Sequence, residues 1–97
     1  MSVAVRLAKL ITVLAGNEVL GLRNSEIAAA MNESRSKVTR DLQQLIEAGL
    51  AEEVPGMSDR WRLGPKIVQI ALAHNSGMAA LQEQINQVQQ RYTRFPT

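Results

Sequence analysis

The sequence contains no cysteine, which excludes disulfide bonds and thiolate metal sites and fits a reducing compartment. Its only aromatic residues are Trp61, Tyr92 and Phe95, so the interior has to be built from aliphatic side chains, a composition that favours helices. No apolar run approaches the roughly 18 residues of a membrane span, and the N-terminal MSVAVRLAKL carries cations where a signal peptide has none. We therefore expect a mostly α-helical cytoplasmic protein with no membrane segment.

The patterns of catalysis and cofactor binding are also missing. The sequence has one histidine, His74, and a lone histidine is no metal site. It has no nucleophile elbow and no glycine-rich phosphate loop, and Glu52 and Glu53 are neighbours that face opposite ways on a predicted strand. We expect no enzymatic activity, no catalytic residue, no metal and no cofactor. His74 is instead expected near a helix end, where an imidazole complements the helix dipole.

Size and charge limit the remaining possibilities. A chain of 97 residues has room for one core that buries roughly 60 to 65% of the unfolded surface. Its net charge is only +2, so an argument for nucleic-acid binding has to rest on where the charges fall.

Apolar spacing predicts three helices in the first half of the chain. The first covers Val3–Leu14, where apolar residues recur at intervals of three and four. Asn24 or Ser25 can cap a second, short helix that ends near a left-handed Asn32. Ser34 can cap a third helix, which Gly49 stops.

The period changes after Gly49. Segments 50–54 and 60–63 are short, alternate in polarity and are separated by PGMSD, which predicts a β-hairpin. A fourth helix is expected from Pro65 until Asn75-Ser76-Gly77 breaks it, and a fifth from residue 78 to about residue 92.

The third helix has an outer face rich in hydrogen-bond donors. At about 100° per residue, Val38 and Leu42 point inward with Leu45 and Ile46. The outer face of the first two turns then carries Ser36, Lys37, Thr39, Arg40 and Gln43. Reading base edges in a major groove while holding nearby phosphates requires such a set, although a solvated surface helix is also polar outside. Asp41 is expected to pair with Lys37, four residues before it.

The layout around this helix favours DNA binding. A short helix, a tight turn and a donor-rich helix form a helix-turn-helix, and a hairpin carrying Arg60 and Arg62 makes a wing. We predict a mostly α fold with a small β-hairpin: a winged helix-turn-helix in residues 1–64, then a linker helix and a C-terminal helix in residues 65–97. The candidate DNA-binding residues are Ser25, Ser34, Arg35, Ser36, Lys37, Thr39, Arg40, Gln43, Arg60, Arg62 and Lys66.

Two residues of the predicted wing have competing interpretations. Arg60 and Arg62 can reach phosphate or the minor groove, or Glu52 and Glu53 on the partner strand can neutralise them. Trp61 alternates with them and is expected to point into the core.

Several of these residues resemble a known family. Three parts of the sequence are similar to the winged helix-turn-helix of IclR-type bacterial transcription regulators: SEIA at 25–28, RWRLGPK at 60–66 and, between them, the pattern of Ser36, Val38, Arg40, Leu42, Leu45 and Gly49. The resemblance covers about residues 3–72. It implies that Ser36, Lys37 and Arg40 contact DNA and that the segment from Pro65 is a linker helix joining dimer partners. We expect no small-molecule effector domain in this sequence.

A heptad pattern marks the predicted fifth helix. Its a and d positions are apolar: Met78, Leu81, Ile85, Val88 and Tyr92. Two heptads are marginal alone, so this seam needs a partner, either a second subunit or the chain's own first helix. A homodimer is favoured because glutamines fill the intervening positions.

Two functions from different classes follow. The first is a dimeric, nucleoid-associated transcription regulator that binds double-stranded DNA. The second is a winged-helix interaction module whose third helix binds an acidic protein. Hydroxyls and glutamine beside the cations favour the first, and the salt dependence of binding to duplex DNA separates the two.

Overall fold

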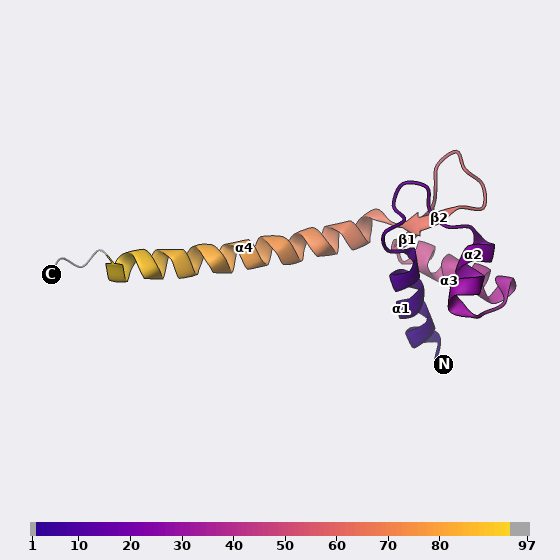
Figure 1. Ribbon diagram of the computed structural model, residues 1–97, viewed down its shortest axis with the longest axis horizontal. Coiled ribbons are helices and arrows are strands. Elements are labelled where there is room, and N and C mark those ends of the chain that lie inside the picture. Colours follow the sequence, from indigo (N-terminus) through magenta and orange to yellow (C-terminus); the bar gives the residue numbers. More distant parts are fainter. Residues whose placement is uncertain (1, 94–97) are drawn as a thin grey trace. The chain divides into compact units, whose positions relative to one another are not determined.

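The computed structural model describes residues 2–93. Along the chain these residues form α1 (Val3–Leu14), α2 (Asn24–Met31), α3 (Arg35–Glu47), β1 (Ala51–Glu53), β2 (Trp61–Leu63) and α4 (Pro65–Thr93), drawn in Figure 1. The chain divides into two compact units, one ending at Ile67 and the other starting at Val68. The linker helix and C-terminal helix were predicted in residues 65–97, of which residues 94–97 lie outside the described residues.

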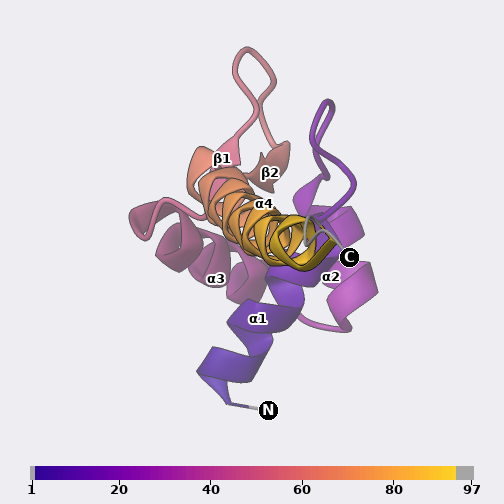
Figure 2. The ribbon, with the colours of Figure 1, turned by 90° about the vertical axis from the view of Figure 1, so that its left-hand side faces the viewer.

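The core of the first unit is aliphatic, as the scarcity of aromatic residues requires. Leu10 and Leu14 of α1, Ile27 of α2 and Leu42 of α3 are fully buried. Val38 and Leu45 are also buried, which confirms the predicted inward face of α3. Figure 2 shows β1 and β2 on one side of the three helices, with the loop between the strands projecting away from them.

The ends of α3 agree with the residues predicted to cap it. Ser34 Oγ accepts a hydrogen bond from the backbone N–H of Lys37 at 3.2 Å, as an N-cap side chain does. Gly49, which follows α3, has φ of 78°. Asn32, at the end of the preceding helix α2, is left-handed as predicted, with φ of 53°.

The predicted cap of α2 is wrong. Arg23 is the N-cap residue, and Asn24 and Ser25 are already inside the helix. Glu26 explains the shift, because its Oε1 accepts a hydrogen bond from the Arg23 backbone N–H at 2.9 Å. A carboxylate three residues into the helix thus satisfies its start without a short polar cap.

The hairpin forms where expected, with slightly shorter strands than predicted. Its antiparallel register pairs Ala51 with Leu63, Glu52 with Arg62 and Glu53 with Trp61. Leu22, just before α2, exchanges two backbone hydrogen bonds with Trp61, at 2.8 and 2.9 Å, and so forms an isolated antiparallel bridge with β2. Trp61 and Leu63 pack against the core, which confirms the inward orientation predicted for Trp61.

The predicted break at Asn75-Ser76-Gly77 is also wrong. These residues lie inside α4, which is one continuous helix of 29 residues (Figure 1). None of the three is proline, so each keeps its backbone N–H for the helix. Glycine costs only about 1 kcal/mol relative to alanine, and strong helix formers, including Ala71, Ala73, Ala79 and Ala80, surround the segment. The propensity of the whole segment therefore outweighs three unfavourable residues.

Candidate nucleic-acid interface

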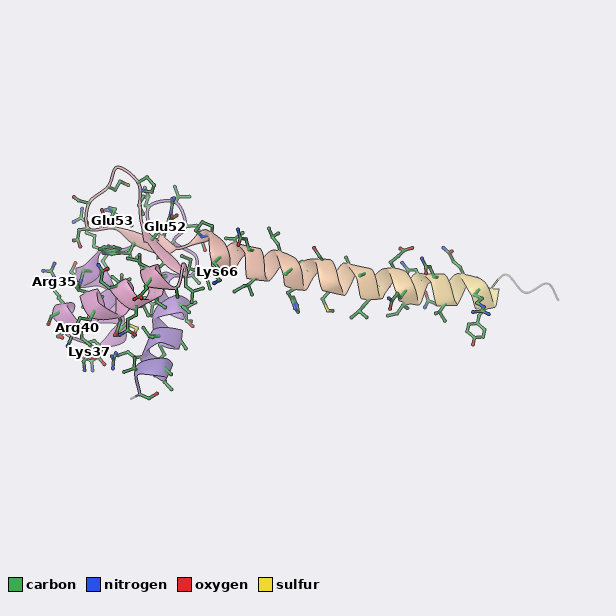
Figure 3. The ribbon with its side chains drawn as sticks, turned by 180° about the vertical axis from the view of Figure 1, so that it is seen from behind. Arg35, Lys37, Arg40, Glu52, Glu53 and Lys66 are labelled. Atoms are coloured by element: carbon green, nitrogen blue, oxygen red, sulfur yellow. The ribbon has the colours of Figure 1, made fainter. Side chains whose placement is uncertain are left out.

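The exposed part of α3 lies over its first two turns. Ser36, Thr39, Arg40 and Gln43 are exposed there, beside the exposed Arg35. Figure 3 shows Arg35, Lys37 and Arg40 gathered at one side of the first unit. Within residues 2–93, neither Arg35 nor Arg40 pairs with a carboxylate. The N-terminal end of the helix dipole adds partial positive charge at the same place, which makes this surface suited to an anion.

The ion pair predicted between Lys37 and Asp41 is wrong. Lys37 Nζ instead lies 3.3 Å from Glu33 Oε2. Asp41 turns inward and forms a two-pronged pair with Arg6 of α1, in which Nε donates to Oδ2 at 2.6 Å and Nη2 to Oδ1 at 3.0 Å. The Asp41 side chain is only 4% exposed, so the arginine replaces the water that the carboxylate loses.

This pair joins α1 to α3. Its hydrogen bond with Asp41 raises the pKa of the Arg6 guanidinium above the ordinary value for arginine. Arginine is not deprotonated in proteins, so Arg6 carries its charge in this pair. No local sequence pattern could have predicted this contact, because 35 residues separate the partners.

Asn24 connects the starts of α2 and α3. Its Nδ2 donates to Arg35 O at 3.1 Å and to Thr39 Oγ1 at 2.8 Å, while Thr39 Oγ1 donates to Arg35 O at 3.0 Å. The hydroxyl of Thr39, predicted to face DNA, is therefore engaged inside the fold. From the sequence, Asn24 was considered only as a cap, and this internal role was not predicted. Asn24 precedes the buried Ile27 and Ala28 by three and four residues. A polar residue on the apolar side of a helix signals an internal hydrogen bond.

The two wing arginines contact the segment between α1 and α2. Arg62 Nε donates to Glu52 Oε1 at 2.9 Å, which confirms one of the expected cross-strand neutralisations, and Nη1 donates to Glu18 O at 3.2 Å. Arg60 Nη1 lies 3.5 Å from Leu20 O, at the limit of a hydrogen bond. Arg62 is consequently the more firmly held of the two.

The remaining candidates lie at different ends of the unit. Ser25 is exposed in the first turn of α2, near the start of α3. Lys66 runs beside Gly49, where an added Cβ would meet Lys66 Cδ at 3.6 Å. It therefore lies at the C-terminal end of α3, away from Arg35, Lys37 and Arg40 (Figure 3).

Residues 2–93 bring together no group of three His, Asp or Glu side chains suited to a metal ion. Within the same residues, none of the helices has both the length and the apolar character to cross a membrane.

Comparison with known proteins identifies the family. Residues 3–55 match the family described as the IclR helix-turn-helix domain. The chain belongs to this family. The match covers α1, α2, α3 and β1, the elements that carry the exposed donor face.

Solved structures of IclR regulators have the same fold. HmgR of Pseudomonas aeruginosa is 26% identical with a TM-score of 0.70, over 81% of this chain and 33% of that one. A putative IclR transcriptional regulator from Silicibacter sp. is 21% identical with a TM-score of 0.69, over 88% of this chain and 33% of that one. The chain thus spans about a third of the length of these regulators. No curated protein sequence matches it.

A shorter winged helix also has this fold. The Zalpha domain of Cyprinid Herpesvirus 3 ORF112, solved with Z-DNA, is 25% identical with a TM-score of 0.55, over 65% of this chain and 97% of that one. The predicted fold is confirmed: the IclR-type chain is a winged helix-turn-helix of the class found in DNA-binding transcription regulators.

Proposed function

We propose that this IclR-type domain binds double-stranded DNA in a sequence-specific way, with α3 in the major groove, and regulates transcription. The observation that carries the proposal is the exposed donor face of α3, which presents Ser36 in the first, positively polarised turn and Arg40 and Gln43 further along the helix. Arginine, hydroxyl and amide groups of different reach suit base edges, whereas phosphate binding alone needs only cations. The Zalpha domain, which shares this fold and was solved with Z-DNA, supports DNA as the partner class.

The contacts of the side chains suggest different roles. Ser36, Arg40 and Gln43 read bases, with Lys37 at the edge of the groove, where its pair with Glu33 sets its direction. Ser25, Ser34 and Arg35 lie near helix starts and hold phosphates. Thr39 and Arg62 are positioning residues, since Asn24 binds the first and Glu52 the second.

The wing, residues 50–63, lies along the backbone or the minor groove. Arg60 is its best-placed cation because only one long contact restrains it. Lys66 reaches a phosphate only on DNA that extends past the C-terminal end of α3.

The regulator acts as a homodimer joined through α4. The seam residues are unusually exposed for their type, at 55% for Met78, 54% for Leu81, 51% for Ile85, 53% for Val88 and 73% for Tyr92. An apolar stripe of this length is normally covered by a partner. Two joined domains read half-sites about 34 Å apart, one turn of DNA.

Binding to duplex DNA across a range of salt concentrations tests the function. After selection of a bound sequence, Arg40→Ala should lose about 1 to 3 kcal/mol of binding free energy and discriminate less between that sequence and altered ones, with little change in the salt slope. Lys9→Ala, a matched loss of one exposed charge on α1, should retain nearly full affinity.

Equal losses for Arg40→Ala and Lys9→Ala would show binding by net charge alone and would refute base reading by α3. Tight binding to an acidic protein with no affinity for DNA would favour the interaction-module function instead.

A further inference from the structure

Because α4 is continuous, His74 lies inside the helix and not near a helix end, where it was predicted. With no break before it, the spacing of three and four that starts at Met78 extends back through His74 to Ala71. Residues 71, 78, 85 and 92 then occupy a positions, and residues 74, 81 and 88 occupy d positions. His74 is the one ionisable side chain at a d position of this seam. Val68 at an e position and Ile70 at a g position flank the seam, while Leu72 at a b position lies on another face.

The positions that flank the seam carry almost no charge. The later e positions are Asn75, Gln82 and Gln89, and the later g positions before Arg91 are Gly77 and Gln84. Between Lys66 and Glu83, His74 is the only titratable side chain on the helix. Charged e and g residues normally select a different partner helix, so their absence allows an identical helix to pair without repulsion.

The surface of α4 has a hollow of the kind that such pairing fills. It is shallow and mainly apolar, and is lined by Leu81, Gln84, Ile85, Val88 and Gln89. The first four are the d, g, a and d positions that surround an a-position side chain of a parallel, in-register partner. The side chain that enters this hollow from an identical helix is therefore Ile85 of the second copy.

We propose that α4 pairs with α4 of a second copy in parallel and in register, and that the two His74 side chains meet as the polar layer of the seam. The inference deepens the proposed dimer and rests on it. A β-branched Ile85 at a beside Leu81 at d favours two strands.

The attachment of the DNA-binding units gives a second reason for the parallel arrangement. Each α4 begins at Pro65, directly after its winged helix, so parallel helices keep both winged helices at the same end. Antiparallel helices would separate those attachment points by nearly the full length of a 29-residue helix, about 43 Å at 1.5 Å per residue.

The histidine layer makes the pairing depend on pH. Histidine is the side chain that changes charge between about pH 5 and 8. In the parallel pair the group facing His74 is its counterpart, and the layers on either side are Ala71 and Met78, which offer no carboxylate. As the pH falls, two positive charges meet in an apolar seam and the dimer weakens. A polar residue in such a seam also fixes its register at a cost in stability.

Cysteine cross-linking tests whether the two α4 helices are parallel. Because the sequence has no native cysteine, any disulfide has to involve the introduced residue. Ala71→Cys and Val88→Cys, prepared separately and oxidised in dilute solution without DNA, should each form a disulfide dimer. Same-position Cα atoms in a parallel pair lie within disulfide reach. A disulfide that forms only in the mixture, between Cys at 71 of one copy and Cys at 88 of the other, would show antiparallel pairing and overturn the proposal. Monomers under all conditions, or capture only of another protein, would overturn it too.

Sedimentation without DNA tests the histidine layer. The dimer dissociation constant of the parent should rise roughly tenfold or more between pH 7.5 and pH 5.5, a change of about 1.4 kcal/mol per tenfold. The His74→Leu variant should have a lower dimer dissociation constant than the parent, and this constant should depend much less on pH. A parent whose constant does not change with pH would contradict the His74 layer. Because neither measurement uses DNA, loss of DNA binding with intact cross-linking would refute the proposed function alone, and the reverse result would refute the pairing alone.

Discussion

The helices α3 and α4 expose opposite kinds of surface. In α3 the apolar face is covered within the chain, with Val38, Leu42 and Leu45 buried, and the polar face is free. In α4 no residue is buried, and the free surface includes the apolar seam. Each helix therefore has one uncovered face, with hydrogen-bond donors on α3 and aliphatic side chains on α4, and our proposals assign nucleic acid to the first and a second copy of α4 to the other.

The same contrast appears in the polar contacts. In the first unit, polar side chains such as Asn24, Asp41 and Arg62 bind across elements and hold the domain in shape. On α4 the side-chain hydrogen bonds are local, as between Gln82 and Asn86. The first unit thus has its own long-range contacts, whereas α4 relies on its helical backbone and on whatever covers the seam.

The largest effect is expected from shortening matched leucines in the two helices. Leu42→Ala removes a fully buried side chain and should cost about 2 to 5 kcal/mol of unfolding free energy, through lost burial and the cavity left behind. Leu81→Ala on α4 should change the stability of the first unit by less than about 0.5 kcal/mol. Chemical denaturation followed by Trp61 fluorescence measures both. Equal losses would show that Leu81 belongs to the same core.

A smaller effect, on assembly, is expected from charging the seam. Ile85→Asp with Val88→Asp places like charges opposite each other, and should raise the dimer dissociation constant by more than about 100-fold, near 2.7 kcal/mol, while the first unit stays folded. Sedimentation at matched concentrations measures this. Gln87→Asp with Gln90→Asp adds the same charge away from the seam and should leave the dimer intact. If the parent protein already sediments as a monomer, the proposed dimerisation through the α4 seam is wrong.

The fold was largely predictable from the sequence because its signals are local. Apolar spacing placed α1 and α3, Asn32 marked the end of α2, Ser34 marked the start of α3, and alternation marked the hairpin. The errors concern the cap of α2, the break in α4 and the partner of Asp41. They share one cause, because in each case a short motif competes with a residue or segment outside that motif. Asp41 lies within reach of Lys37 on the helix surface, but burial against α1 makes Arg6 the stronger partner.

The candidate site was predictable in part for the same reason. Helical geometry showed which side chains of α3 point outward, such as Ser36 and Arg40. It did not show which of them are engaged elsewhere, because the partner of Thr39 comes from α2 and a partner of Arg62 from the loop after α1.

A moderate effect is expected from removing an amide in each region. Asn24→Ala removes hydrogen bonds to Arg35 O and Thr39 Oγ1, and should cost about 1 to 2 kcal/mol of stability and some affinity for DNA, since the start of α3 is less firmly held. Asn86→Ala on α4 breaks one exposed bond with Gln82 and should cost almost nothing. Thermal melting and DNA titration of both variants check this. An Asn24→Ala protein with parental stability and affinity would show that the link to α3 is dispensable.

The smallest effect is expected from Gly77→Ala, and its sign decides whether α4 is continuous. A Cβ at Gly77 meets no atom within 4 Å, and alanine is the better helix former, so the variant should gain about 0.5 to 1 kcal/mol in helix stability. Its helicity by circular dichroism should rise slightly, and the dimer should be at least as stable as the parent. If the helix were interrupted there with Gly77 in a left-handed conformation, alanine would be strained and the same substitution would destabilise the protein. A loss of helicity or of dimer stability would therefore contradict the continuous helix, and with it the place of His74 on the seam.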